Sequence, residues 1–216
     1  MQFNKGSNVY FLIITFMQMI DMISISGGQP AMAMPLFFVV LVSMVKDAFE
    51  DYKRKQADDQ ENNSNVQLYE PNSKKFIASK WRNMHVGEIV RIKCDDQIPA
   101  DMLILHTNDE KGSCYVETKN LDGETNLKIK TANKDLQNKF LSEKELNEID
   151  GEVVCEPPNN AIYKFEGTCK VAGIQSTLSL NVDNLLLRGS IMRNTEWAYG
   201  LVIFQGHDTK IMRNSA

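Results

Sequence analysis

The sequence has few of the residues that form metal sites or disulfides. Its 216 residues include four cysteines and three histidines. The cysteines have no short paired spacing and the histidines lie far apart, at Cys94, Cys114, Cys155 and Cys169 and at His85, His106 and His207. A structural zinc site needs ligands in close pairs. We therefore predict no metal site and, on the cytosolic side inferred below, free buried thiols.

An excess of basic residues and a nucleotide-binding loop are also absent. The formal net charge is −4, which does not favour nucleic acid as a partner. A loop that holds nucleotide phosphates needs several glycines before its lysine, whereas Gly206–Lys210 (GHDTK) has only Gly206. The isolated chain is therefore expected not to hydrolyse ATP.

Charge is missing from two long stretches near the start of the chain. Val9–Ile20 and Met22–Val45 contain no charged residue, and Asp21 stands between them. This length and composition predict two transmembrane helices. A cleaved signal peptide is disfavoured because the apolar sequence continues far beyond the length of a signal. A buried soluble hairpin is disfavoured because two such runs would have to bury nearly every side chain.

Basic residues follow the second apolar stretch. Lys46, Lys53, Arg54 and Lys55 come after it, while the connection 24–30 has no lysine or arginine. The positive-inside tendency then places everything after Lys46 in the cytosol. Alternating charges at helical spacing over residues 46–55 indicate a helical stalk. The polar run 56–65 (QADDQENNSN) indicates a linker.

From Val66 onward the pattern is mostly that of β-strands. Short runs rich in branched and aromatic residues, separated by Pro, Gly, Asn and Asp, occur at 66–70, 75–79, 88–93, 102–107 and 113–118, and again at 151–156, 162–171, 185–192 and 198–206. Between the two groups, residues 134–149 are predicted to be helical. We expect a two-layer sandwich or jelly roll with one helical insertion.

The last strand of the first group leads into a polar turn. Cys114, Tyr115 and Val116 favour a strand, and Asp122-Gly123-Glu124-Thr125 follows, with a carboxylate on each side of a glycine. By itself this pattern is typical of a solvated hairpin corner. A polar loop delivered by a strand can equally serve a partner outside itself, so both interpretations stay open at this point.

Five sequence blocks carry a resemblance to a known family. They are Gln97–Asp101 (QIPAD), Cys114–Lys128 (CYVETKNLDGETNLK), Leu187–Gly189 (LRG), Arg193–Thr195 (RNT) and Gly206–Lys210 (GHDTK). In this order they closely resemble the actuator domain of P4-type ATPases, the phospholipid flippases. Other P-type ATPases have Thr-Gly-Glu-Ser at the position of Asp122–Thr125, and the variant seen here is typical of the lipid-transporting branch.

The resemblance implies a plan for the domains. Residues 1–55 would be transmembrane helices 1 and 2 with the stalk, and 56–65 the linker. Residues 66–210 would be a mainly-β actuator domain, a distorted jelly roll or double sheet with a helical insertion, and 211–216 the start of the connection to the next membrane helix. The sequence contains no Asp-Lys-Thr-Gly phosphorylation segment and no nucleotide-binding domain. We therefore expect an amino-proximal fragment of a pump.

The resemblance also implies a reaction. In such pumps an aspartate takes phosphate from ATP, and the actuator glutamate positions and deprotonates the water that hydrolyses the aspartyl phosphate. Glu124 matches that glutamate. Gly123 would let the backbone pass close to the phosphorylated site, and Asp122 and Thr125 would shape the turn through side-chain to backbone bonds. Rotation of the domain would pull on the stalk and on the connection after Gly206.

Substrate, cofactors and partners follow from the same resemblance. The expected activity is ATP-driven movement of phospholipid from the outer or luminal to the cytosolic leaflet of a eukaryotic plasma membrane or a Golgi or endosomal membrane. ATP and Mg²⁺ would bind outside this fragment. Its partners would be the missing phosphorylation and nucleotide-binding domains and an accessory β-subunit of the CDC50 type.

Gln18 is the candidate contact for the phospholipid headgroup. Its side chain can donate to a headgroup or bond a neighbouring helix, and both readings stand. The family often has Gln-Gln followed by Ile-Pro here, whereas this chain has Gln18-Met19-Ile20-Asp21. The alternative for the whole chain is a membrane-anchored β-sandwich that binds partners without turnover.

Overall fold

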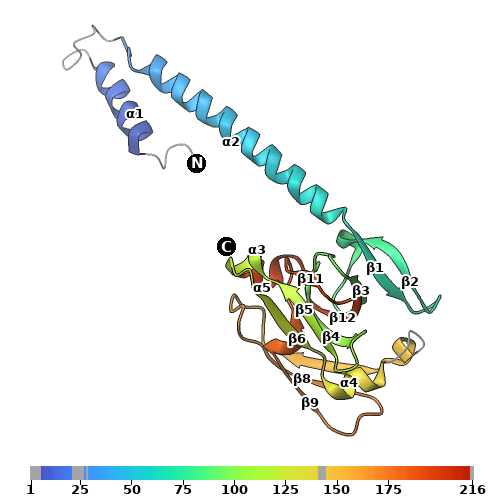
Figure 1. Cartoon of the computed structure of the whole chain (residues 1–216). Helices are drawn as coiled ribbons and strands as arrows, with labels where there is room; N and C mark the ends of the chain where they lie inside the picture. Colours follow the sequence, from blue (N-terminus) through green and yellow to red (C-terminus); the bar gives the residue numbers. More distant parts are fainter. Residues whose placement is uncertain (1–5, 21–26, 28, 141–144, 215–216) are drawn as a thin grey trace. The chain divides into compact units, whose positions relative to one another are not determined.

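The chain divides into two compact units. The computed structural model describes residues 6–20, 27, 29–140 and 145–214. The first unit is Met1–Glu61 and the second is Asn62–Ala216. Figure 1 shows helices in the first and mainly strands in the second.

The first unit contains two helices, α1 (Gly6–Gln18) and α2 (Ala33–Asn62). Among the described residues no helix is both long and apolar enough to cross a bilayer. α1 has 13 residues, whereas a helix that crosses the bilayer core needs about 20 apolar residues. At about 1.5 Å per residue α1 is roughly 20 Å long, which is too short to cross the core. α2 has 30 residues, but its apolar part ends at Lys46. The prediction of two transmembrane helices is therefore wrong; Asp21 and most of the 24–30 connection lie outside the described residues.

The helix predicted for residues 46–55 is confirmed, since α2 runs through them, and its role as a stalk stays a prediction. Lys46 pairs with Glu50 at 3.4 Å and Arg54 with Asp51 at 4.0 Å, at helical spacings that favour the helix. The helix continues to Asn62, so most of the predicted linker 56–65 is not a loop. The alanine, glutamine and glutamate residues of this run have high helix propensity, so the helix continues although the run lacks an apolar face.

The second unit is built from strands with short helical turns. The strands are β1 (Asn65–Glu70), β2 (Lys75–Lys80), β3 (Ile89–Lys93), β4 (Asp101–Thr107), β5 (Ser113–Glu117), β6 (Leu127–Thr131), β7 (Gly151–Cys155), β8 (Glu166–Val171), β9 (Leu178–Asn181), β10 (Leu185–Leu186), β11 (Ile191–Arg193) and β12 (Trp197–Phe204). The α-helices are α3 (Lys119–Asp122), α4 (Lys134–Lys139) and α5 (Lys210–Asn214). Single 3-10 turns occur at Trp81–Asn83, Glu145–Glu148, Val182–Asn184 and Gly206–Asp208.

The strands form three antiparallel sheets. One has six strands in the order β10-β4-β12-β3-β1-β2, and two have three strands each, β11-β5-β6 and β7-β8-β9. The strand runs predicted from the sequence are confirmed as strand-forming regions, but the expected double sheet is replaced by this three-sheet arrangement. The predicted run 185–192 separates into β10 and β11, in different sheets, because Gly189 turns the chain with a φ of 87°.

The core lies on both faces of the six-stranded sheet. All seven residues of β4 are buried. Met102 and Ile104 belong to one buried cluster, while Leu103 and Leu105 belong to the other, as expected for side chains that alternate along a strand. A strand that is covered on both faces reads as a continuous apolar run, which is the pattern of MLILHT.

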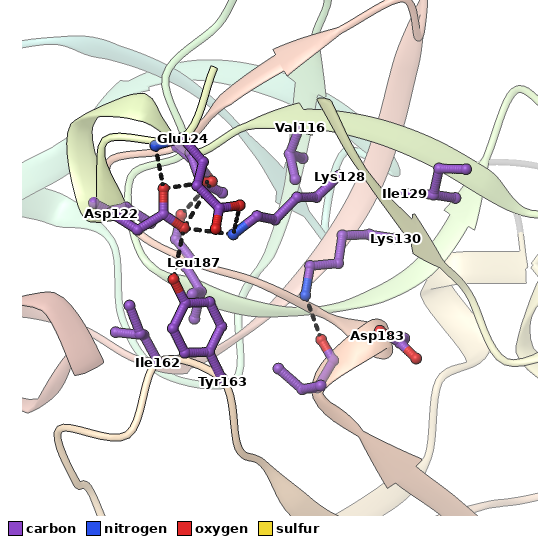
Figure 2. A pocket seen from close by; sticks show the side chains of 14 residues that line it. Val116, Asp122, Glu124, Lys128, Ile129, Lys130, Ile162, Tyr163, Asp183 and Leu187 are labelled. Atoms are coloured by element: carbon purple, nitrogen blue, oxygen red, sulfur yellow. Dashed lines mark hydrogen bonds and ion pairs between the residues drawn. The ribbon is translucent and has the colours of Figure 1, made fainter. Parts of the chain in front are cut away.

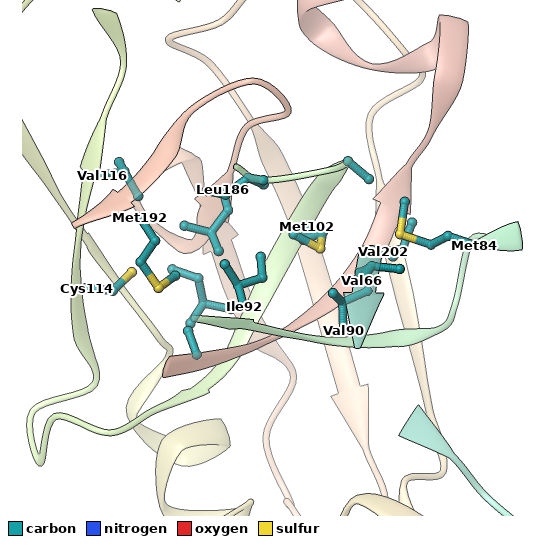
Figure 3. Close-up of a cluster of buried hydrophobic side chains, with 14 of the residues drawn as sticks. Val66, Met84, Val90, Ile92, Met102, Cys114, Val116, Leu186, Met192 and Val202 are labelled. Carbon is teal, nitrogen blue, oxygen red and sulfur yellow. The ribbon is translucent and has the colours of Figure 1, made fainter. Parts of the chain in front are cut away.

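Each small sheet covers one of these two faces. Figure 3 shows Met102 in the same cluster as Val116 of β5 and Met192 of β11. The opposite cluster includes residues of β8 and β9, such as Cys169 and Leu178. Burial of each large side chain contributes about 1.5–3 kcal/mol, so this packing fixes β5, and with it the loop that follows β5.

The predicted helix over 134–149 is shorter in the structure. α4 begins at Lys134, where Asn133 accepts a hydrogen bond from Asp135 N at 3.0 Å, and ends at Lys139. Phe140 follows it, fully buried in the core. Residues 141–144 lie outside the described residues, and Glu145–Glu148 is a 3-10 turn. The helical insertion is thus limited to one short α-helix and a turn.

Candidate functional site

The Asp122–Thr125 turn lies in the connection between β5 and β6. The two strands pair in an antiparallel hairpin whose last partners are Glu117 and Leu127. Between them the chain makes one helical turn, α3, which ends at Gly123 in a left-handed conformation with a φ of 77°. L-residues with a Cβ avoid that conformation. A Cβ at Gly123 would meet nothing within 4 Å, so within this chain the glycine is needed for its backbone angle.

Asp122 is the centre of a hydrogen-bond network. Its carboxylate accepts from Thr118 Oγ1 at 3.1 Å, from the Glu124 backbone N–H at 2.9 Å and from the Tyr163 hydroxyl at 3.0 Å. Lys128 Nζ also donates to it. The side chain is only 7% exposed. Figure 2 shows the donors converging on this carboxylate from separate parts of the chain.

The network keeps Asp122 ionised. Burial raises the pKa of the carboxyl, but the hydrogen bonds from Lys128, the Glu124 N–H, Tyr163 and Thr118 outweigh it and lower the pKa to about 2. Burial lowers the pKa of Lys128, but its hydrogen bonds to Asp122 and Glu124 outweigh this effect and raise the pKa. The carboxylate of Asp122 is therefore ionised at neutral pH and has a structural role in the turn.

Glu124 has the opposite environment. Its side chain is 57% exposed, and Lys128 Nζ lies 3.1 Å from its Oε2. The backbone N–H of Glu124 is held by Asp122 at 2.9 Å. The loop thus fixes the backbone of Glu124 while presenting its carboxylate outward beside a lysine.

A cleft of about 480 Å³ lies below this loop. The residues that line it are Val116, Thr118, Leu121, Asp122, Glu124, Lys128, Ile129, Lys130, Ile162, Tyr163, Val182, Asp183, Leu187 and Ser190. Figure 2 shows Lys130 pointing towards the Val182–Asp183 turn, where its Nζ donates to Val182 O at 2.6 Å. Burial lowers the pKa of Lys130, although Asp183 opposes the shift.

Comparison with known proteins decides the family. The chain is 39% identical to phospholipid-transporting ATPase DRS2 of Saccharomyces cerevisiae over 214 residues, which is 99% of this chain and 16% of that protein. It is 42% identical to phospholipid-transporting ATPase FetA of Mus musculus and 41% identical to phospholipid-transporting ATPase 10 of Arabidopsis thaliana, each over 214 residues. These matches cover 99% of this chain and 18% and 17% of those proteins.

The chain is a relative of the P4-type phospholipid-transporting ATPases. The resemblance predicted from the five blocks is confirmed, and the chain spans less than a fifth of the length of these relatives. No protein-family model matches it. A zinc-transporting PIB-type ATPase in the E2.Pi state aligns with a TM-score of 0.39 and 8% identity, over 69% of this chain and 15% of that chain.

The other sequence blocks that carry the resemblance have structural roles in this chain. Asp101 of QIPAD is fully buried and accepts from Arg188 N of LRG at 2.9 Å and from Lys210 N of GHDTK at 2.7 Å. Burial raises its pKa, and these two hydrogen bonds oppose the shift. One carboxylate therefore ties three of the five blocks together.

The fourth block, RNT, holds the strand that leads to the loop. Arg193 Nε donates to Glu117 Oε2 at 2.9 Å, and Arg193 also pairs with Asp95. Thr195 Oγ1 accepts from Tyr115 N at 3.0 Å. The middle of β5 and its last residue are thus held by β11 and the residues after it.

The remaining predicted site residues, Thr125 and Gln18, take separate places. Thr125 is exposed, and within the part of the chain that the structure describes its side chain makes no hydrogen bond, so Asp122 alone supplies the predicted side-chain to backbone bond. Gln18 is the last residue of α1, and its Oε1 accepts from Met32 N at 3.0 Å. It belongs to the first unit, and its contact with a phospholipid stays a prediction.

The P4-type family name implies ATP, and with it Mg²⁺. The described residues contain no group of three or more His, Cys, Asp or Glu side chains that could hold a metal ion. Asp122 and Glu124 both pair with Lys128, and the chain has no glycine-rich phosphate loop. The residues described in this chain therefore do not fit a site for either group.

Tyr163 and the double role of Lys128 were missed by sequence reasoning. Lys128 stands within the matched block, but its four-residue spacing from Glu124 indicates an ion pair only on a helix, and here it lies on β6. Tyr163 lies 41 residues after Asp122, and no pattern in the sequence connects the two.

Proposed function

We propose that the second unit is the actuator of a phospholipid-transporting ATPase and that Glu124 serves the hydrolysis of an aspartyl phosphate held by another domain. The observation that supports this is the contrast between the two carboxylates of the loop. The carboxylate of Asp122 accepts the hydrogen bonds that hold the turn, one of them from the Glu124 backbone N–H. The side chain of Glu124 is 57% exposed. The carboxylate that the loop presents to a partner is therefore that of Glu124.

The proposed chemistry is general-base catalysis. A water oxygen attacks the phosphorus of the aspartyl phosphate, the bond from phosphorus to the aspartate oxygen breaks, and the water proton passes to Glu124. Lys128, 3.1 Å from Glu124 Oε2, orients the carboxylate and helps to offset the negative charge where the loop meets the phosphate. ATP and Mg²⁺ would act on the partner domain in forming that phosphate.

The transport step would use the two chain connections of the unit. α2 ends at Asn62, three residues before β1 begins, and α5 begins at the buried Lys210. A rotation of the second unit that brings Glu124 to the phosphate would pull on both connections. In this proposal the whole protein uses ATP to move phospholipid towards the cytosolic leaflet, with an accessory β-subunit of the CDC50 type as a further partner. The membrane involved stays a prediction.

A chimeric pump tests the proposal. This chain would replace the 214 residues that it matches in the Saccharomyces cerevisiae relative, and Glu124→Gln would be made in the chimera. We expect the variant to form phosphoenzyme from ATP but to lose it about 100- to 10,000-fold more slowly, because the base is gone while side-chain size is kept. Decay of the labelled phosphoenzyme after a chase measures this.

The matched control is Glu110→Gln, which changes an exposed glutamate in the turn before β5. It should leave decay unchanged. If the chimera carries phosphoenzyme and Glu124→Gln decays at the parental rate, Glu124 does not have this role. If the chimera binds its partners but never forms phosphoenzyme in the parental form, a scaffold without turnover is favoured.

A further inference from the structure

One irregular segment contacts both the loop and the end of the second unit. It is residues 156–163, between β7 and β8, and it includes Pro157 and Pro158. It has no regular secondary structure apart from turns. Its first residues hold Lys210 and its last residue holds Asp122.

The first contact is a buried ion pair. The Lys210 side chain is 0% exposed, and its Nζ donates to Glu156 Oε1 and to Asn159 Oδ1, each at 2.8 Å. Burial raises the pKa of Glu156, but the bonds from Lys210 and Asn159 outweigh it and lower the pKa. Because a buried ammonium needs its partners, the position of the segment is tied to that of α5, which begins at Lys210.

The second contact is made by Tyr163. Its hydroxyl donates to Asp122 Oδ2 at 3.0 Å, and Lys128 Nζ lies 4.9 Å from the centre of its ring. Figure 2 shows the ring of Tyr163 beside this network, with its hydroxyl directed at Asp122. The tyrosine therefore touches both side chains that hold Glu124.

The segment between these contacts is short and stiffened. The two prolines have fixed φ angles. Asn159 Nδ2 donates to Pro157 O at 3.2 Å, and Asn159 Oδ1 accepts from Ala161 N at 3.0 Å. The same Asn159 oxygen receives Lys210, so the internal turn and the ion pair are one structure. A displacement of Lys210 should therefore move the segment as a unit and change the position of Tyr163.

We propose that residues 156–163 form a strap that sets the position of the Asp122–Thr125 loop according to the position of α5. Tyr163, Glu156 and Asn159 are positioning residues in this view, because they act on Glu124 only through Asp122 and Lys128. The relevance for hydrolysis rests on the proposed function of Glu124. The physical coupling through the strap does not depend on that function.

Nuclear magnetic resonance on the full 216-residue chain tests the coupling. The readouts are the pKa of the Asp122 carboxyl and the chemical shift of the Glu124 amide proton. Tyr163→Phe removes only the hydroxyl, and we expect the Asp122 pKa to rise from about 2 and the Glu124 amide to shift. Tyr115→Phe is the matched control: its hydroxyl makes no hydrogen bond within the described part of the chain, and neither readout should move.

The decisive variant is remote from the loop. Glu156→Ala should change both readouts in the same direction as Tyr163→Phe and add little in a Tyr163→Phe background, because both changes act through one connection. Glu156→Gln, which retains an oxygen for Lys210, should restore most of the parental values. If Glu156→Ala fails to fold, Asn159→Ala takes its place and should have the same effect.

The proposal is overturned if Glu156→Ala or its replacement leaves Asp122 and the Glu124 amide unchanged, since Tyr163 is then only a local partner. It is also overturned if Tyr163→Phe changes neither readout. These measurements need no phosphorylated partner. If the strap variants change both readouts but Glu124→Gln leaves phosphoenzyme decay unchanged, the proposed function is wrong and the strap stands. If Glu124→Gln slows phosphoenzyme decay but the strap variants change neither readout, the strap is wrong and the proposed function stands.

Discussion

Asp122 and Glu124 are two residues apart, yet they have opposite surroundings. The left-handed backbone at Gly123 ends the helical turn and sends Glu124 away from the network around Asp122. Divergent environments for neighbouring carboxylates are how one site obtains two roles from one chemical group. Here one carboxylate builds the turn and the other is presented outside it.

The ionisation of Asp122 makes a prediction about acid stability. Its pKa is lowered in the folded chain to about 2, below the value of about 3.9 for an unfolded aspartate. The group therefore stabilises the fold above pH 4, and that contribution is lost as the pH falls towards 2. Asp122→Asn should lower the free energy of unfolding at neutral pH by about 1–2 kcal/mol, which is on the order of what a pKa lowered from about 3.9 to about 2 represents, reduced by the solvent around the partly exposed Lys128.

Urea unfolding of the parental chain and of Asp122→Asn at several pH values checks this. The difference in stability should be constant above about pH 5 and shrink towards pH 2, following the linkage between pKa and stability. A difference that stays the same down to pH 2 would show that Asp122 has an ordinary pKa in the folded chain.

At this scale the sequence predicts the outward glutamate but not all its neighbours. The Asp122–Thr125 turn and Lys128 are local, so a matched block contains them. Tyr163 reaches Asp122 only because the β7–β8 connection passes beside the β5–β6 loop, which is a property of the assembled sheets. Thr125 was predicted to shape the turn together with Asp122, but within the described residues the side-chain to backbone bond of the turn is made by Asp122, which accepts from the Glu124 N–H.

Among the elements, strands were predicted better than helices. Each strand run has branched and aromatic residues between turn formers, and those signals act locally. Helix extent depends on what the ends pack against. α4 ends where Phe140 enters the core. The later part of α2 has no buried side chain that would end the helix before Asn62. α2 is long, but the charged residues that begin at Lys46 and Asp47 limit its apolar part, so it is not apolar enough to cross a bilayer.

The fully buried strand β4 should contribute much of the stability of the second unit. Leu103 is 0% exposed and lies in the cluster beneath β7, β8 and β9. Leu103→Ala removes buried methyl groups and leaves a cavity, so we expect a loss of about 2–5 kcal/mol in the free energy of unfolding. Ile77→Ala is the control, because Ile77 on β2 is 42% exposed and should lose much less. Urea unfolding measures both; equal losses would contradict the large contribution of β4.

For the whole molecule, the order of strands was beyond prediction. β12 lies between β4 and β3 in the six-stranded sheet, although about a hundred residues separate it from them in the sequence, so its place is set by long-range pairing. Local patterns do not specify such pairings. They do specify that residues 102–105 of β4 form a continuous apolar run that must be covered on both faces, and three sheets satisfy this as well as two.

The division into two units predicts independent folding of the second. Both buried clusters consist only of residues after Asn62 among those described, so the apolar burial that stabilises this unit needs nothing from residues 1–61. A chain of residues 62–216 should therefore unfold cooperatively at the same urea midpoint and with the same m-value as the second unit in the full chain. Tryptophan fluorescence reports on this unit alone, because Trp81 and Trp197 both lie within it. A lower midpoint would show that α1 or α2 contributes to its stability, and the loop carrying Glu124 would then have to be studied only in the full chain.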